Sequence, residues 1–299
     1  MHERAAPQRG EVTTSTDRRA RASRRGHSAV RRSLIDRAAA WWREGWNSYT
    51  RQAEYGIFGW EGPTTDPEHD RGVLPAAVFW DMDGTLADTE SHWTAARANL
   101  AREHGIPWGA LDSQAFIGAP LTASAAEMRR RGLPLEDDEL IDEIVTRALK
   151  AIRSDLRWRP GALELLSRMC DAGTPCALVT MAYKSVADFV AESAHPAAFQ
   201  AVIAGNDVIR GKPHPEPYLR AVGALRVNPA DCLAIEDTRI GAESATAAGI
   251  PTLVISDQSG QSILASTATR RSLEGISYQD LANIKGEAHA RLTNTRPLR

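Results

Sequence analysis

The sequence predicts an α/β protein with a doubly wound parallel sheet and a helical cap domain inserted into it. Two observations lead to this fold class. Short apolar runs, rich in Val, Ile, Leu and Ala, alternate with helical stretches along most of the chain. Such runs are typical of strands buried on both faces, and their alternation with helices favours right-handed crossovers. In addition, the interval 91–157 holds helical stretches only, which indicates an insertion.

The N-terminal segment differs from the rest in composition. Residues 1–60 hold twelve Arg against six Asp or Glu, and residues 1–32 have almost no large apolar side chains. We expect 1–32 to be a disordered basic tail, because such a segment cannot bury a core. A transit peptide, a nucleic-acid tail and a tail without a defined role all stay open, so the partner of this tail is unknown.

Residues 33–75 are predicted to form an amphipathic helix and a linker. Large apolar residues such as Trp42, Trp46 and Tyr49 recur at helical spacing, and a stretch rich in Pro and Gly follows at 61–75. The helix either packs its Trp face on the main domain or binds a membrane surface or a partner.

The core domain is predicted at residues 76–90 and 158–299. Its five expected strands are Ala76–Trp80, Cys176–Val179, Ala201–Ala204, Cys232–Ile235 and Thr252–Ile255. The expected helices between them are Gly161–Asp171, Ser185–Ser193, Pro215–Ala224 and Ile240–Ala248. Ligands of such sheets bind outside the carboxyl ends of the strands, so the residues that follow each strand are the candidates for chemistry.

The helical cap domain is predicted at residues 91–157. Its helical stretches are expected at about 90–104, 111–117, 121–131 and 136–152. In this arrangement the insertion follows the first strand of the sheet directly.

Composition sets further limits. The formal net charge is −2, and the acidic remainder of the chain gives no reason to expect a nucleic-acid partner for the core. No apolar run approaches the length of about eighteen residues that predicts a transmembrane helix. The three cysteines, Cys170, Cys176 and Cys232, have no metal-like spacing and are odd in number. We therefore expect a cytoplasmic protein, with a monomer as the default state.

Polar residues follow the expected strands in a pattern that suits phosphoryl transfer. The first strand ends in Asp81-Met82-Asp83-Gly84-Thr85, the second at Thr180, and the fourth in Glu236-Asp237, while Lys212 follows the third. These groups should converge on one edge of the sheet. Mg²⁺ held by carboxylates offsets the repulsion between an anionic phosphate and a carboxylate nucleophile, and Lys212 and Thr180 can bind phosphoryl oxygens. Asp81 is then the nucleophile and Asp83 the general acid and base.

These motifs resemble the haloacid dehalogenase (HAD) superfamily, in particular its β-phosphoglucomutase and phosphoglycolate phosphatase-like members with a helical cap after the first strand. Asp81-x-Asp83-Gly84-Thr85, Thr180, Lys212 and Glu236-Asp237 match the four motifs in order over about residues 76–257. The resemblance implies Mg²⁺ bound by Asp81, the backbone carbonyl of Asp83, and Asp237, with Glu236 adjacent. In this architecture the cap supplies substrate selectivity, so Gly118 is a candidate substrate contact, and Trp93, Ile117 and Leu121 are further plausible cap contacts.

Departures from the mutase pattern favour a phosphatase. Trp93 stands where the resemblance implies a His in a mutase, and Phe116-Ile117-Gly118-Ala119-Pro120-Leu121 lacks the basic pair expected around the cap glycine. Met181 replaces a polar residue after Thr180. Asp83 has no use in a dehalogenase or a phosphonate-cleaving enzyme. We expect a Mg²⁺-dependent phosphatase acting on a small, sugar-phosphate-like metabolite; a phosphomutase and a non-catalytic binding protein are the alternatives.

Overall fold

The computed structural model describes residues 73–195, 197–256 and 264–295. The expectations for the basic tail and for most of the segment 33–75 lie outside these residues. Among the described residues, no helix is both long and apolar enough to cross a membrane.

A six-stranded parallel sheet forms the centre of the described region, in the order β3-β2-β1-β4-β5-β6. The strands are β1 (Val78–Trp80), β2 (Cys176–Val179), β3 (Ala201–Ile203), β4 (Leu233–Glu236), β5 (Thr252–Ile255) and β6 (Ala268–Arg270). The strand order changes direction at β1, which is the kind of switch point where parallel sheets bind ligands. The predicted fold class is confirmed.

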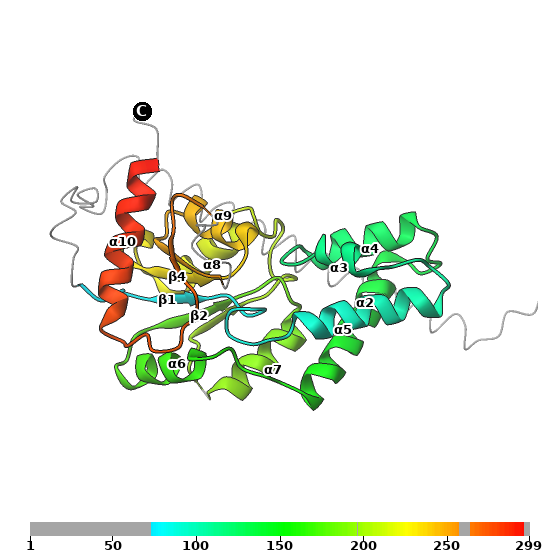
Figure 1. Ribbon diagram of the computed structural model, residues 1–299, viewed down its shortest axis with the longest axis horizontal. Coiled ribbons are helices and arrows are strands. Elements are labelled where there is room, and N and C mark those ends of the chain that lie inside the picture. The colour runs from blue at the N-terminus through cyan, green and yellow to red at the C-terminus, as the bar shows by residue number, and fades with distance from the viewer. Residues whose placement is uncertain (1–72, 196, 257–263, 296–299) are drawn as a thin grey trace, which may run out of the picture. The chain divides into compact units, whose positions relative to one another are not determined.

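Helices cover both faces of this sheet (Figure 1). One face packs on α6 (Ala162–Asp171), α7 (Lys184–Ala194) and α10 (Asp280–Thr295), and the other on α8 (Glu216–Leu225) and α9 (Arg239–Ala247). Alternating residues of β1 point to opposite faces: Val78 and Trp80 join the first core, and Phe79 joins the second. Strands β1, β2, β4 and β5 are therefore buried between two apolar layers.

Two details of the sheet differ from expectation. The edge strand β3 is only half-buried, whereas burial on both faces was expected. Among the described strands, β2 alone borders it, and its other edge faces away from the sheet. Strand β6 and helix α10 were not predicted. For β6 the reason is that this short segment contains Thr and Arg rather than an apolar run.

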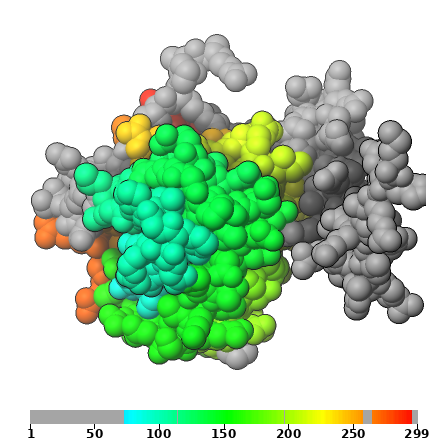
Figure 2. Space-filling view, turned by 90° about the vertical axis from the view of Figure 1, so that its right-hand side faces the viewer, coloured from blue at the N-terminus to red at the C-terminus, as the bar shows by residue number. Residues whose placement is uncertain are grey.

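The helical insertion lies between β1 and β2. It consists of α2 (Glu90–Glu103), α3 (Ala110–Gln114), α4 (Leu121–Arg130) and α5 (Asp137–Ser154). Figure 2 shows this insertion end on, with its cyan and green residues at the front of the view. The apolar faces of α2, α4 and α5 pack together through residues such as Leu100, Met128 and Ile144, which are almost completely buried. These residues belong to the same apolar cluster as Val78 and Trp80 of β1, so the interior of the insertion is continuous with one layer of the core of the sheet domain.

Candidate active site

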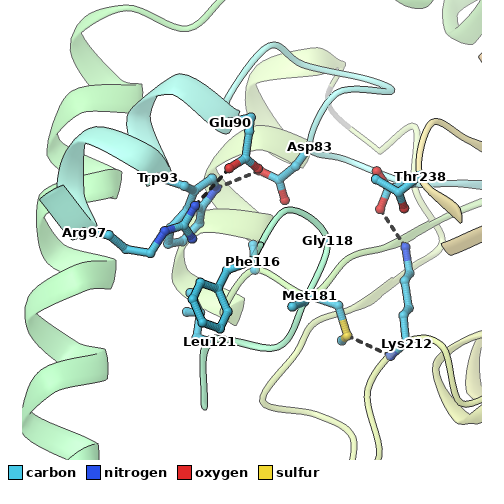
Figure 3. A pocket seen from close by; sticks show the side chains of 13 residues that line it. Asp83, Glu90, Trp93, Arg97, Phe116, Gly118, Leu121, Met181, Lys212 and Thr238 are labelled. Carbon is cyan, nitrogen blue, oxygen red and sulfur yellow. Dashed lines mark hydrogen bonds and ion pairs between the residues drawn. The ribbon is translucent and has the colours of Figure 1, made fainter. Parts of the chain in front are cut away.

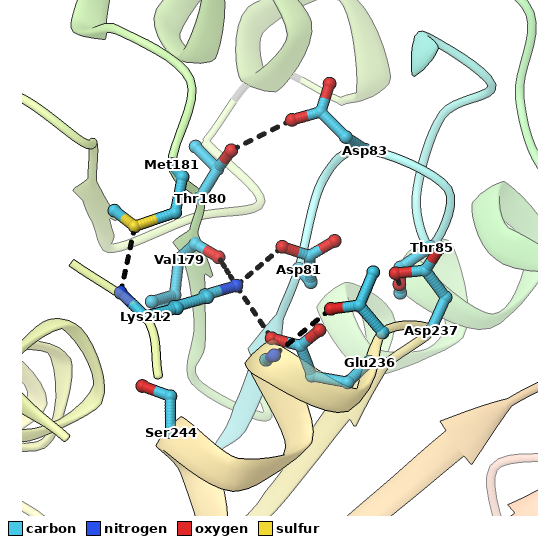
Figure 4. Close-up of polar contacts among 12 residues, drawn as sticks. Asp81, Asp83, Thr85, Val179, Thr180, Met181, Lys212, Glu236, Asp237 and Ser244 are labelled. Carbon is cyan, nitrogen blue, oxygen red and sulfur yellow. Dashed lines mark hydrogen bonds and ion pairs between the residues drawn. The ribbon is translucent and has the colours of Figure 1, made fainter. Parts of the chain in front are cut away.

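Acidic and basic side chains meet at the carboxyl edge of the sheet. Asp81 directly follows β1, Thr180 directly follows β2, and Glu236 is the last residue of β4. Lys212 reaches the same place from the loop before α8 (Figure 4). The side chains of Asp81, Lys212 and Glu236 are buried, as are those of their neighbours on the adjoining strands. Parallel pairing of β1 with both β2 and β4 brings these strand ends together.

Lys212 is the centre of this arrangement. Its ammonium group donates to Asp81 Oδ1 at 2.6 Å, to Glu236 Oε1 at 2.6 Å and to the backbone oxygen of Val179 at 2.9 Å. These three acceptors match the three N–H groups of an ammonium. Burial lowers the pKa of Lys212, but the Asp81 and Glu236 carboxylates outweigh burial and hold this pKa above its usual value. Lys212 is therefore a fixed cation that orients both carboxylates.

Glu236 is completely buried. The Tyr218 hydroxyl donates to its Oε1 atom, which also accepts from Lys212, while Oε2 has no hydrogen-bond partner among the described residues. Burial and the nearby Asp81 charge raise the pKa of Glu236 to about 7. Gly241, in the first turn of α9, allows this close packing, because a Cβ atom there would lie 1.9 Å from Oε2.

Asp237 lies beside Glu236 and also depends on a glycine. Burial raises the pKa of Asp237, and the charges of Asp81 and Glu236 raise it further. Gly84 has a φ of +87°, which favours glycine, and a Cβ atom at this position would lie 2.1 Å from Asp237 Oδ2. The absence of a side chain at Gly84 thus leaves room for the Asp237 carboxylate.

The three carboxylates suit a divalent cation. One ligand atom each of Asp81, Glu236 and Asp237 lies within 4.8 Å of the others. Oxygen ligands of this kind are those that Mg²⁺ prefers. The Oε2 atom of Glu236 has no partner among the described residues, and the pKa of Asp237 is raised. Both observations indicate negative charge that the Lys212 ammonium does not neutralise. The donor set therefore fits Mg²⁺.

Asp83 is held apart from this cluster by three donors. Its Oδ1 accepts from the Thr89 hydroxyl and, at 2.7 Å, from Trp93 Nε1, while its Oδ2 accepts from Thr180 Oγ1 at 3.2 Å. Burial raises the pKa of Asp83, the Asp81 charge raises it further, and the three donors oppose the shift. Two neighbouring carboxyls, Asp81 and Asp83, thus sit in different surroundings.

A pocket opens between the strand ends and the cap (Figure 3). The predicted cap residue Gly118 lines it, with a φ of +71° and a close approach to Thr238 across the pocket wall. Met181 also lines the pocket, and its sulfur accepts a hydrogen bond from the backbone N–H of Lys212 at 3.0 Å. Ile117, also considered a cap contact, is not part of the lining.

Sequence reasoning missed three side chains in this region. Thr89 contacts Asp83, and Glu90 and Arg97 line the pocket from α2. Glu90, Trp93 and Arg97 are spaced by three and four residues, so they share one helix face. Because Trp93 was already considered, this spacing was the signal that could have led to the other two.

Comparisons with known proteins identify the family of this chain. The family model of haloacid dehalogenase-like hydrolases matches residues 75–249. Validoxylamine A 7'-phosphate phosphatase of Streptomyces hygroscopicus subsp. limoneus is 31% identical over 174 residues, which cover 58% of this chain and 82% of that protein. Hexitol phosphatase A of Escherichia coli K12 is 30% identical over 184 residues, covering 59% of this chain and 81% of that protein.

Solved structures show the same fold. CbbY from Rhodobacter sphaeroides in complex with phosphate superposes with a TM-score of 0.63 at 23% identity, covering 70% of this chain and 100% of that chain. β-Phosphoglucomutase from Clostridium difficile gives a TM-score of 0.64 at 19% identity, covering 72% and 98%. With a family match over more than half of its length, this chain belongs to the haloacid dehalogenase-like hydrolases.

Proposed function

We propose that this protein is a Mg²⁺-dependent phosphatase that hydrolyses a small, sugar-phosphate-like monoester through an aspartyl-phosphate on Asp81. The observation that supports it most directly is the buried arrangement of Lys212 between Asp81 and Glu236, next to Asp237. Family membership and the phosphatases among its relatives make it a phosphohydrolase.

The metal would be held by Asp81, Asp237 and the backbone carbonyl of Asp83, with Glu236 adjacent. When bound, Mg²⁺ supplies positive charge that offsets repulsion between the phosphate and the carboxylates. Lys212 supplies a further positive charge, and its hydrogen bond to Asp81 orients this carboxylate.

In the first half-reaction, Asp81 attacks the phosphorus atom. A bond forms between a carboxylate oxygen and phosphorus while the bond from phosphorus to the leaving oxygen breaks. Asp83 gives its proton to the leaving oxygen, a role that suits a carboxyl whose pKa is raised by burial. The Thr180 hydroxyl, which contacts Asp83 in this structure, would donate to a phosphoryl oxygen of the bound substrate instead.

In the second half-reaction, water hydrolyses the aspartyl-phosphate. The Asp83 carboxylate, now ionised, takes a proton from water as its oxygen attacks phosphorus. The bond between Asp81 and phosphorus breaks, which releases inorganic phosphate and restores both side chains. Thr89 and Trp93 stabilise the ionised form of Asp83 during this step.

The substrate class is drawn from the relatives. Three relatives are named as phosphatases of small phosphorylated compounds. They are validoxylamine A 7'-phosphate phosphatase, hexitol phosphatase A and a phosphorylated carbohydrates phosphatase of Thermotoga maritima. We assign selection of the substrate to the cap at residues 91–157, whose helix α2 and Gly118 segment line the pocket above the core domain at 76–90 and 158–299.

Phosphate release from p-nitrophenyl phosphate by the full chain tests the proposal. We expect release with Mg²⁺, none after chelation by EDTA, and none from Asp81→Asn. Asp155→Asn, an exposed change at the end of α5, serves as the control and should retain activity. Equal release from wild type and Asp81→Asn would refute the proposal, and isomerisation of a hexose phosphate without release of phosphate would favour the phosphomutase.

A further inference from the structure

An ion pair between the buried Arg97 and the half-buried Glu90 lines the pocket on the side of the cap. Arg97 Nη2 contacts Glu90 Oε1 at 2.9 Å, and both residues belong to α2. The Arg97 residue is only 3% exposed, which is unusual for a guanidinium that is not at the acidic cluster. In Figure 3 the Arg97 side chain runs along Trp93 toward Glu90, and Phe116 and Leu121 lie below these residues in the view.

This pair has hydrogen-bonding capacity left. Arg97 Nε is buried and has no hydrogen-bond partner among the described residues. Glu90 accepts from Arg97 and from Thr94 Oγ1, and both bonds use the same oxygen, Oε1. Buried donors normally have partners, so an unpartnered one in a pocket wall points to a ligand group.

The charges around the pair indicate which ligand group fits. Glu90 and Arg97 together are nearly neutral, and Asp83 lies on the adjoining wall of the pocket. A second phosphate group here would meet the Glu90 carboxylate as well as the guanidinium. A hydroxyl group instead can donate to Glu90 and accept from Arg97 at the same time. The faces of Trp93, Phe116 and Leu121 complete the wall with apolar surface that suits the C–H groups of a sugar or polyol.

We propose that Glu90 and Arg97 bind the leaving group of the substrate and select a neutral polyhydroxylated alcohol over one that carries a second phosphate. This inference rests on the proposed phosphatase function. It assigns specificity to a pair of side chains on α2, seven residues apart, which the chemistry at Asp81 does not require.

The test compares kcat/KM for three kinds of substrate: a panel of hexose and hexitol monophosphates, glucose 1,6-bisphosphate, and p-nitrophenyl phosphate, which has no hydroxyl groups on its leaving group. The variant is the double substitution Glu90→Gln/Arg97→Met, which removes both charges together and keeps the side chains near their original size. Arg102→Met, at an exposed position on the same helix, is the matched control.

We expect wild type to prefer a monophosphate of the panel over the bisphosphate. In the double variant, the ratio of kcat/KM for that monophosphate to kcat/KM for p-nitrophenyl phosphate should fall by about tenfold or more, the loss typical of hydrogen bonds to a charged group. The control should keep the wild-type ratio.

An unchanged ratio in the double variant, a preference for the bisphosphate, or no activity on any monophosphate of the panel would overturn the inference while leaving the phosphatase intact. Failure of wild type to hydrolyse p-nitrophenyl phosphate would instead count against the proposed function itself.

Discussion

The indole N–H of Trp93 donates to Asp83 Oδ1 at 2.7 Å, so a residue of the cap helix α2 holds the carboxyl that is proposed to act as acid and base. An indole N–H can only donate, and the Thr89 hydroxyl donates to the same oxygen. Oδ1 is therefore held as an acceptor by two donors, whereas Oδ2 accepts from the Thr180 hydroxyl alone among the described residues.

Trp93→Phe should impair catalysis and shift its pH profile. The Trp93 hydrogen bond lowers the pKa of Asp83, so its loss moves the limb of the kcat profile that reports Asp83 to higher pH. We expect kcat to fall by about fivefold to tenfold, in line with one lost hydrogen bond. Trp108→Phe is the control, because the Trp108 indole donates to Ser113 within the cap and does not line the pocket. Identical pH profiles for wild type and Trp93→Phe would contradict this role.

Gly84→Ala should weaken Mg²⁺ binding. The added Cβ would lie 2.1 Å from Asp237 Oδ2, so the carboxylate must move. We expect the Mg²⁺ concentration for half-maximal activity to rise and the free energy of unfolding to drop by about 1–3 kcal/mol.

Gly132→Ala separates the two causes of this effect. Gly132 has a φ of +99°, and a methyl group added there would meet no neighbouring atom within 4 Å. This control therefore introduces the backbone strain without the clash. A normal Mg²⁺ requirement in Gly84→Ala would show that the contact with Asp237 does not matter.

Tyr218→Phe should loosen the carboxylate cluster. The variant removes the hydroxyl that donates to Glu236 Oε1 and leaves Lys212 as the donor to that oxygen among the described residues. Loss of a buried hydrogen bond to a charged group lowers the free energy of unfolding by about 1.5–3 kcal/mol. Urea unfolding measures this change, and Tyr278→Phe, whose hydroxyl contacts Thr174 far along the chain, is the matched control. Equal losses of unfolding free energy in the two variants would mean that the charge of Glu236 does not strengthen its hydrogen bond with Tyr218.

Glu90 should make the protein less stable as the pH rises. Burial raises the pKa of Glu90 to about 7 from its usual value of 4.5, with Arg97 opposing the shift and Asp83 adding to it. Between these two values the folded protein binds more protons than the unfolded chain, so the free energy of unfolding falls with increasing pH. For this residue alone the fall is at most about 3 kcal/mol from pH 4 to pH 8.

Urea unfolding at several pH values, with EDTA present throughout, measures this dependence. Glu90→Gln cannot ionise, so its unfolding free energy should vary less with pH than that of wild type over the same interval. Parallel curves for the two proteins would assign the dependence to other groups.

The sequence predicted those parts of the fold that depend on simple apolar patterns. The run Cys176–Val179 became β2 with the predicted bounds, because a short strand buried on both faces needs only apolar residues. Asp81, Thr180 and Glu236 could be located because parallel strands end at one edge. Strand β6 has no such pattern, since β5 is its one neighbour in the part of the sheet that the structure describes and its last two residues are half-buried.

The cap side of the pocket was harder to predict for a different reason. Helical spacing places Glu90 and Arg97 on one face of α2, but which face meets the pocket depends on how the whole insertion packs on the sheet. That packing joins residues far apart in the chain, such as Gly118 and Thr238. Hydrogen bonds across it, including those to Asp83, are therefore visible only in three dimensions.

The edge-on contact between Phe79 and Tyr218 connects the apolar core to the acidic cluster at the edge of the sheet. The two rings lie 6.3 Å apart at an interplanar angle of 81°, in the apolar layer beneath the carboxylates, and Tyr218 reaches from there to Glu236. Engineering for heat resistance that repacks this layer would alter turnover as well. The exposed ion pairs of the cap, such as that between Arg129 and Asp137, are safer places for such substitutions.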